Sequence, residues 1–327
     1  MSFSGDIVVT DIGGTHARFA IARIESGSIA ALGDLRKLAT ADFSSLQMAW
    51  DAYQSGLDRK MPKNGAVAIA GTVQGKSLTF TNSSWLFRAE HARAKLGLVR
   101  FTLVNDFAAI AHAVATLPEG QFAYVCGEKR DLPEGAAVSI VGPGTGLGVS
   151  CLTLKKDGYL VHSTESGHIG FAPFDQVEDK ILAYLRRTHR RVSVERIVSG
   201  PGLSAVYQAL GHIGNSPVQD LNDKEIWKLA LSGRDPLASA ALDRFCLCFG
   251  AFAGDIALAH GAKRVVLAGG ITERIGDLLG GSGFSDRFVA KGRLQSEMSE
   301  TGVYRITHEQ PGLYGAAAAF LKEHDTS

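Results

Sequence analysis

The stretch that decides the fold runs Ile7-Val8-Val9-Thr10-Asp11-Ile12-Gly13-Gly14-Thr15-His16-Ala17-Arg18-Phe19-Ala20-Ile21-Ala22. Its first four residues are mostly apolar and β-branched, as in a buried strand, and a second apolar run resumes at residues 19–22. Gly13 and Gly14 predict a tight turn between the runs, because glycine adopts positive φ and has no Cβ to keep a ligand from the backbone. The stretch therefore predicts a strand, a glycine turn and a second strand.

The groups around this turn suit a metal-bound polyphosphate. Asp11 ends the first predicted strand with a carboxylate, and Thr15 adds a hydroxyl beside the backbone N–H groups of the turn. Such groups can reach a hydrated cation and donate hydrogen bonds to phosphate oxygens. An ordinary hairpin with a Gly-Gly turn is equally compatible with these residues alone, because short motifs also occur by chance.

A second stretch repeats the pattern in the middle of the chain. An apolar run at 138–141 leads into Gly142-Pro143-Gly144-Thr145-Gly146-Leu147-Gly148, and another apolar run follows at 149–154. Neither loop contains the Walker A pattern, and neither has the Rossmann fingerprint, because each continues into a strand rather than a helix. Two such loops, each opening one half of the chain, predict paired lobes that hold a phosphate chain from both sides.

Asn105 and Asp106 lie between a predicted buried strand at 101–104 and a strongly helical run at 107–115. A carboxylate at this place could cap the helix, which is worth about 1 kcal/mol. It could also act on a ligand, because ligands gather at the carboxyl ends of strands in α/β sheets. Both roles are compatible, since the helix dipole favours the ionised form of Asp106.

Three further polar residues and a glycine pair are candidates for a binding site. Glu165 and His168 lie beside glycines, and one histidine with one carboxylate does not make a metal site. A polyol, which needs fixed donors and acceptors, fits them better, although a structural turn stays open. Glu195 could be a surface charge or a helix-capping partner. Gly269-Gly270 follows a predicted strand and leaves room for a flat ring, although a simple tight turn is equally possible.

Composition excludes several classes of function. The 327 residues suggest about two domains, and 34 basic against 33 acidic residues leave no basic field for nucleic acid. The basic run at 186–191 is interpreted as the solvated end of a helix predicted over 175–191. No secretory signal, spanning helix or zinc-type Cys/His spacing is found. A cytoplasmic protein without a membrane or nucleic-acid partner is expected.

The motifs together resemble a known superfamily. Asp11-Ile12-Gly13-Gly14-Thr15 resembles the first phosphate loop of the sugar kinase, Hsp70 and actin superfamily, and Gly144-Thr145-Gly146 resembles its second. Within that group the chain is similar, nearly end to end, to bacterial ATP-dependent glucokinases of the hexokinase-like type. The most specific segments are Val104-Asn105-Asp106-Phe107, the 142–148 loop and Ser199-Gly200-Pro201-Gly202-Leu203. The related ROK sugar kinases carry a cysteine-rich zinc motif, which this sequence lacks.

The resemblance implies an α/β fold with two ribonuclease-H-like (actin-like ATPase) lobes around a central cleft. The small lobe would comprise residues 1–116 plus 308–327, and the large lobe residues 117–307. A closing helix from Pro311 would pack back on the first lobe. A homodimer is also expected, by resemblance alone.

The resemblance further implies phosphoryl transfer from MgATP to the 6-hydroxyl of glucose, the entry step of glycolysis. Asp106 would be the catalytic base, and Asp11 would position Mg²⁺ through water. The residues implied to hold the sugar are Asn105, Asp106, Glu165, His168 and Glu195. Those implied to bind ATP are Thr10, Asp11, Ile12, Gly13, Gly14, Thr15, Gly144, Thr145, Gly146, Gly269 and Gly270. Ser166 and Gly170 depart from the family pattern, which usually has Gly and Asp there.

Three alternatives stay open at this point. The chain could phosphorylate another hexose or several, such as mannose, glucosamine or fructose. It could bind sugar and ATP as a regulator without turnover. It could be an actin-like or Hsp70-like ATPase, which would share the phosphate loops but would not need Glu165, His168 and Glu195 together.

Overall fold

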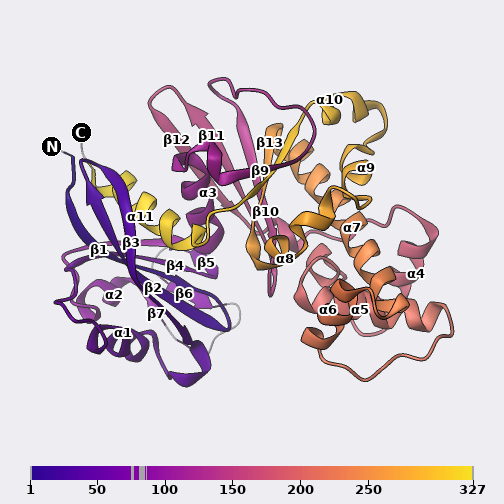
Figure 1. Cartoon of the computed structure of the whole chain (residues 1–327), viewed down its shortest axis with the longest axis horizontal. Helices are drawn as coiled ribbons and strands as arrows, with labels where there is room; N and C mark the ends of the chain where they lie inside the picture. The colour runs from indigo at the N-terminus through magenta and orange to yellow at the C-terminus, as the bar shows by residue number, and fades with distance from the viewer. Residues whose placement is uncertain (1, 75–76, 81–84, 86, 326–327) are drawn as a thin grey trace. The chain divides into compact units, whose positions relative to one another are not determined.

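The computed structural model describes residues 2–74, 77–80, 85 and 87–325, which form two compact units (Figure 1). Unit 1 comprises residues 1–119 and 308–327, and unit 2 comprises residues 120–307. The first change of unit therefore falls at 119 rather than at the predicted 116.

Unit 1 is built on a five-stranded sheet with the strand order β3-β2-β1-β4-β8. Its strands are β1 (Gly5–Ile12), β2 (His16–Glu25), β3 (Ser28–Ala39), β4 (Asn64–Ile69) and β8 (Arg100–Asn105). β1 pairs antiparallel with β2 and parallel with β4, and β4 pairs parallel with β8. The predicted opening hairpin is present, but β1 continues through Asp11 to Ile12.

A second, three-stranded sheet of unit 1 contains β5 (Gly71–Gln74), β6 (Ser77–Phe80) and β7 (Phe87–Arg88). Residues 78–82 could form a strand by their sequence; the first three lie in β6, and the last two lie outside the described part of the chain.

Helices cover both faces of the five-stranded sheet. They are α1 (Leu46–Ser55), α2 (Ala89–Lys95), α3 (Asp106–Thr116) and α11 (Pro311–His324). Phe19 of β2 stacks on Tyr53 of α1, with ring centroids 4.9 Å apart. α11 packs against α3, β1, β4 and β8. Because neighbouring residues of a strand face opposite sides, Val8 can join the α1 cluster while Asp11 meets Gly312 of α11.

Gly315 lets α11 pack closely on α3, and we expect its replacement to be destabilising. A Cβ at residue 315 would lie 1.8 Å from the carbonyl oxygen of Ala109, which belongs to helical backbone and cannot rotate away. Gly315→Ala should lower the free energy of unfolding by about 1–3 kcal/mol or more, measured by urea unfolding. Gly33→Ala is the control, because a Cβ there would meet nothing within 4 Å. Equal stability of the two variants would contradict this packing.

Unit 2 is built on a six-stranded sheet with the strand order β12-β11-β10-β13-β14-β9. Its strands are β9 (Phe122–Cys126), β10 (Ala137–Pro143), β11 (Leu147–Lys155), β12 (Gly158–Thr164), β13 (Ala262–Leu267) and β14 (Gly302–Ile306). β10 pairs antiparallel with β11 and parallel with β13, just as β1 pairs with β2 and β4. Each unit thus contains the same five-strand, ribonuclease-H-like topology, to which unit 2 adds β9. The predicted α/β fold with two such lobes is confirmed.

The helices of unit 2 surround a long central helix, α7. They are α4 (Gln176–Leu185), α5 (Gly200–Ile213), α6 (Asp223–Ser232), α7 (Pro236–His260), α8 (Gly269–Leu279), α9 (Phe284–Val289) and α10 (Gln295–Ser299). Of the helices described, α7 alone is long and apolar enough to cross a membrane by length and composition, a point that the sequence reading overlooked. It packs against α5, α6 and α9, and 61% of its apolar window is buried, which accounts for its composition.

Two predicted helices are shorter than expected. The helix predicted over 175–191 begins after the Asp175 cap and ends at Leu185, so the basic residues 186–191 lie beyond it. Thr188 N donates to the Leu185 carbonyl at 3.2 Å, which closes a tighter turn instead of extending the helix. The helical spacing of apolar residues also predicts a helix over 43–57, but α1 begins only at Leu46, after a cap by Ser45.

Candidate active site

The first glycine turn, in unit 1, is held in place by hydrogen bonds that its carbonyl oxygens accept. Gly13 N donates to the His16 carbonyl at 2.9 Å and closes the turn. Thr40 donates from its N–H to the Thr15 carbonyl (3.1 Å) and from its hydroxyl to the Gly14 carbonyl (2.9 Å). Thr15 itself is exposed. The protein thus fixes the carbonyl oxygens of a turn whose threonine faces solvent.

Asp11 is partly buried beside this turn. Arg18 Nη1 lies 3.0 Å from Asp11 Oδ2, and the Asp11 side chain is 18% exposed. Burial raises the pKa of Asp11, and the charge and hydrogen bond of Arg18 oppose that shift. The start of α11 is also close, since a Cβ at Gly312 would lie 2.7 Å from the Asp11 carboxylate. Sequence reasoning missed Arg18, although the hairpin register pairs residue 11 directly with residue 18.

Asp11 fits an indirect role toward a cation. Among the described residues, no group of three or more His, Cys, Asp or Glu side chains could hold a metal ion. Mg²⁺ bound with nucleotides keeps several waters and needs only one or two protein carboxylates. The donor set beside the first turn therefore suits a hydrated Mg²⁺ and no all-protein metal cage.

Thr10 and Ile12, also predicted to bind ATP, have side chains in the core of unit 1. Their exposed fractions are 0% and 1%. Both lie on β1, between β2 and β4. Their side chains therefore support the strand that ends in the turn.

Asn105 and Asp106 lie where β8 meets α3, as predicted, but the cap is Asn105. Asn105 Oδ1 accepts from Phe107 N (2.9 Å) and Ala108 N (3.0 Å), and its amide donates to the Gly71 carbonyl (3.0 Å). Asp106 is the first helical residue, half-buried, and its Oδ1 accepts from Phe107 N at 2.9 Å. Because Asn105 caps the helix, the carboxylate of Asp106 is not needed for that purpose.

The second glycine loop, in unit 2, lies between β10 and β11. Gly144 N donates to the Gly146 carbonyl (2.8 Å), and Gly200 N, at the start of α5, donates to the Gly144 carbonyl (2.7 Å). Thr145 is exposed at the tip. The first bond joins the two ends of the loop to each other, and the second joins the loop to the start of α5.

Gly269 and Gly270 open α8 at the same edge of the unit 2 sheet, because β10 and β13 are parallel neighbours. Gly269 has φ +86°, and a Cβ there would lie 2.6 Å from the Pro143 carbonyl oxygen. Only glycine fits this close approach. The structure therefore brings the second loop and the Gly-Gly pair together.

Glu165, His168 and Glu195 converge in unit 2. His168 Nε2 lies 3.9 Å from Glu165 Oε2, and His168 Nδ1 lies 3.7 Å from Glu195 Oε1. The side chains are 54%, 47% and 26% exposed in the order Glu165, His168, Glu195. Two carboxylates and an imidazole that face one another and solvent form a set of acceptors and donors suited to the hydroxyls of a polyol.

A short backbone pairing holds these side chains together. Glu165 precedes the turn η3 (Ser166–His168), His168 is the last residue of η3, and Glu195 lies in η4 (Val194–Arg196). Downstream of η3, Phe171 N donates to the Val192 carbonyl and Val194 N to the Ile169 carbonyl, both at 3.0 Å. Gly170 forms a bridge with Ser193, and a Cβ at 170 would meet nothing within 4 Å. The loop geometry thus does not depend on glycine at this departure from the family pattern.

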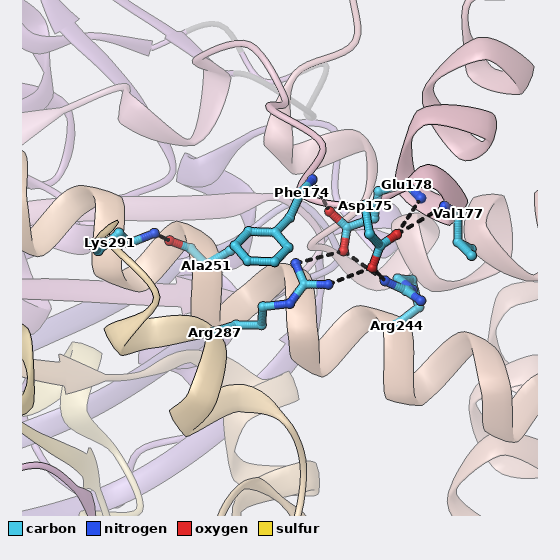
Figure 2. A network of polar contacts seen from close by, with 8 residues as sticks. All are labelled: Phe174, Asp175, Val177, Glu178, Arg244, Ala251, Arg287 and Lys291. Carbon is cyan, nitrogen blue, oxygen red and sulfur yellow. Dashed lines mark hydrogen bonds and ion pairs between the residues drawn. The ribbon is translucent and has the colours of Figure 1, made fainter. Parts of the chain in front are cut away.

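A buried ion network fixes the chain just after this pairing (Figure 2). Arg287 Nη2 lies 2.7 Å from Asp175 Oδ2, and Arg244 Nη1 lies 2.9 Å from Glu178 Oε1. Glu178 is 1% exposed, and its Oε2 accepts from Phe174 N at 2.7 Å. Burial raises the pKa of Asp175, but hydrogen bonds from Glu178 N and Arg244 outweigh it and leave the pKa below its usual value. Sequence reasoning missed this network.

Comparison with known proteins identifies the family of the chain. The sequence model of the Glucokinase family matches residues 8–323. The chain is 49% identical over 319 residues to the glucokinase of Zymomonas mobilis, covering 98% of each chain. A crystal structure of glucokinase from an Antarctic psychrotroph is 32% identical, with a TM-score of 0.83 over 98% of this chain and 100% of that one. A ROK family glucokinase from Streptomyces griseus, solved in complex with glucose and AMPPNP, shares the fold at 20% identity, with a TM-score of 0.61 over 96% and 98%. The chain therefore belongs to the glucokinase family.

Proposed function

We propose that the residues described above carry out the reaction of this family. The chain is an ATP-dependent glucose kinase, which transfers a phosphoryl group from ATP to glucose. The convergence of Glu165, His168 and Glu195 carries the proposal, because a phosphate-loop ATPase without a sugar substrate has no need of such a set. We assign it to the hexokinase-like type, which is supported by the lack of the cysteine-rich zinc motif of ROK kinases.

Asp106 acts as the general base in this proposal. Its carboxylate accepts the proton of the glucose 6-hydroxyl and orients the oxygen toward the terminal phosphorus of ATP. The assignment is supported by the place of Asp106 at the carboxyl end of β8, where ligands gather in α/β sheets, and by Asn105, which supplies the helix cap. Phosphoryl transfer needs little covalent work from the protein, so this orientation and proton acceptance are its main contributions.

The glycine loops bind the phosphates of ATP in this proposal. Backbone N–H groups and hydroxyls of residues 13–15 and 144–146 donate to phosphate oxygens, while Gly269 and Gly270 border the adenosine. Asp11 holds Mg²⁺ through water, and the cation, when bound, neutralises charge on the phosphates. Arg18 fixes the orientation of the Asp11 carboxylate through the 3.0 Å contact between Arg18 Nη1 and Asp11 Oδ2.

Glu165, His168, Glu195 and Asn105 bind the sugar hydroxyls in this proposal. Asn105 Oδ1 is committed to the α3 cap and one amide hydrogen to Gly71, so the second amide hydrogen is the group left to donate to the sugar. In each of these contacts a sugar hydroxyl would meet a protein group that is already in position. Preorganised contacts of this kind favour one arrangement of hydroxyls over its epimers.

The decisive experiment is ADP release from MgATP with a panel of hexoses and a control without sugar. Turnover confined to glucose supports a strict glucokinase. Comparable rates with mannose, glucosamine or fructose would widen the substrate while keeping the mechanism. Equal ADP release without sugar would contradict the proposal and indicate an ATPase, and sugar binding without any ADP release would indicate a regulator.

Glu165→Ala should chiefly weaken sugar binding. A hydrogen bond to a charged group contributes about 1.5–3 kcal/mol, so the KM for glucose should rise roughly 10- to 100-fold. The KM for ATP should stay near its wild-type value. Glu165→Gln keeps an acceptor oxygen and is the control, with a smaller rise. An unchanged glucose KM in Glu165→Ala, measured by steady-state kinetics, would remove Glu165 from the sugar site.

A cytoplasmic homodimer completes the proposal. It is supported by the resemblance to bacterial glucokinases. Sedimentation velocity at micromolar concentration would report the dimer directly, and a purely monomeric protein would contradict it.

A further inference from the structure

Leu147, the residue that follows the second glycine loop, is contacted by both sugar-site turns. Its N–H donates to Glu195 Oε2 at 2.9 Å. Its carbonyl oxygen is covered by Gly167 of η3, where a Cβ would lie only 2.0 Å away. The Leu147 side chain is buried, at 6% exposed. One peptide residue is therefore held by η4 on its amide side and by η3 on its carbonyl side.

The two carboxylate oxygens of Glu195 face different partners. Oε2 accepts from Leu147 N, while Oε1 lies 3.7 Å from His168 Nδ1 and belongs to the sugar-facing set. Gly146 makes the approach possible, because a Cβ there would lie 2.6 Å from Glu195 Oε2. At the other end of the loop, Gly144 is bonded to Gly200 N. Glu195 is thus the side chain that joins the sugar-facing set to the loop.

We propose that Glu195 couples sugar binding to nucleotide binding through the Leu147 amide. The inference rests on the proposed function, since it takes residues 144–146 as a phosphate-binding loop and Glu195 as a sugar ligand. A sugar hydroxyl that donates to Oε1 restricts rotation of the carboxylate, and Oε2 then holds Leu147 N–H more firmly. The loop is ordered before ATP arrives, so nucleotide binds more tightly when sugar is present. By linkage, nucleotide tightens sugar binding by the same factor.

Glu165 provides a matched comparison for Glu195. Both are carboxylates within 4 Å of His168, and Glu195 in addition accepts the N–H of Leu147 at the end of the glycine loop. Glu165→Ala should therefore weaken sugar binding without changing nucleotide binding to the sugar-free enzyme. Glu195→Ala should change both, because the Leu147 amide loses its acceptor even when no sugar is bound.

The first measurement is the affinity of the full chain for Mg–AMPPNP by calorimetry, with and without saturating glucose. In the absence of glucose, Glu195→Ala should bind AMPPNP about tenfold more weakly than wild type, the cost of an unpaired amide. Glu195→Gln keeps an acceptor and should stay near wild type, as should Glu165→Ala. Glucose should tighten AMPPNP binding in wild type and Glu165→Ala, but not in Glu195→Ala.

Two further readouts separate coupling from a general defect. Hydrogen exchange of the peptide spanning 142–148 should be faster in Glu195→Ala than in wild type without any ligand, while a peptide from β14 stays unchanged. Gly146→Ala should reproduce the loss of coupling, because its Cβ displaces the Glu195 carboxylate without removing it. Gly146→Ala also serves if Glu195→Ala does not fold.

The outcomes are distinct. If wild type binds glucose and AMPPNP but Glu195→Ala shows wild-type AMPPNP affinity and exchange, the coupling is overturned and the proposed function stands. If wild type does not bind AMPPNP at all, the proposed function fails and the coupling fails with it.

Discussion

Asp106→Asn is expected to lower kcat by about 10²- to 10⁴-fold, the usual contribution of a positioned general base. Asparagine keeps an oxygen that can accept from Phe107 N, which Asp106 Oδ1 does at 2.9 Å, but it cannot accept the proton of a sugar hydroxyl. Glucose binding should change little, because the other proposed sugar ligands remain. Steady-state kinetics and glucose titration by calorimetry measure the two effects separately. Asp106→Ala should behave similarly, since the Asn105 cap stays in place.

The chain contains a matched control for this variant. Asn222 caps α6 and Asp223 is its first residue, just as Asn105 caps α3 and Asp106 is its first residue. Asp223 is exposed and lies outside the proposed site. Asp223→Asn should therefore leave kcat unchanged while it removes the same charge from the same helical position. Comparison of the two variants therefore separates the effect of losing a charge at a helix start from the effect of losing the catalytic base.

Three results would contradict the assignment of Asp106. Turnover of Asp106→Asn within a few fold of wild type would exclude it as the base. A loss shared equally by Asp106→Asn and Asp223→Asn would attribute the defect to helix stability. A large loss of glucose affinity with unchanged kcat would instead make Asp106 a binding residue only.

Most of the fold could be predicted because its signals are local. Each glycine loop lies between two apolar runs, and this pattern predicted the hairpins β1–β2 and β10–β11 that open each unit's sheet. The sequence from Pro236 to His260 likewise predicts one long helix, and α7 has these bounds, since Pro236 starts the helix and Gly261 ends it in a left-handed conformation. Where two local signals competed, prediction failed. Neighbouring Asn105 and Asp106 could both cap α3, and in the structure the cap is Asn105.

The polar contacts that shape the site could not be predicted, because they join residues distant in sequence. Glu195 reaches Leu147 across 48 positions, and Arg287 reaches Asp175 across 112. No periodicity encodes such pairs. The convergence of Glu165, His168 and Glu195 was expected by resemblance alone, and the residues themselves left a surface charge equally open for Glu195. Arg18 is the exception, because hairpin pairing predicts its position opposite Asp11.

Glu178→Ala is expected to lower the free energy of unfolding by about 3–5 kcal/mol, the cost of leaving buried charges without their partner. Glu178 is 1% exposed, and the side chains of Arg244 and Arg287 around it are only 16% and 10% exposed. Without Glu178, Asp175 is the one carboxylate that remains paired with both guanidinium groups among the described residues, and Phe174 N loses its acceptor. Figure 2 shows the carboxylate between the two arginines. Urea and thermal unfolding of the full chain measure the loss.

Asp179→Ala is the control for this variant. Asp179 is the next residue of α4, lies in the same first turn and is exposed. Its removal deletes the same charge near the same helix start, and surface changes of this kind usually stay within about 0.5 kcal/mol. A loss of stability in Glu178→Ala no larger than that of Asp179→Ala would show that the buried network contributes nothing.

A compensating variant tests the physical cause of the loss. If unpaired buried charge is what destabilises Glu178→Ala, removing one of the two arginines as well should recover part of the stability. Replacing buried ion pairs by apolar residues of similar volume is often neutral or stabilising. Glu178→Leu combined with Arg287→Met should therefore be more stable than Glu178→Leu alone, although Arg287 also lies 3.9 Å from the Phe174 ring. No recovery in the double variant would mean that Glu178 stabilises α4 through its bond to Phe174 N, and not by neutralising Arg287.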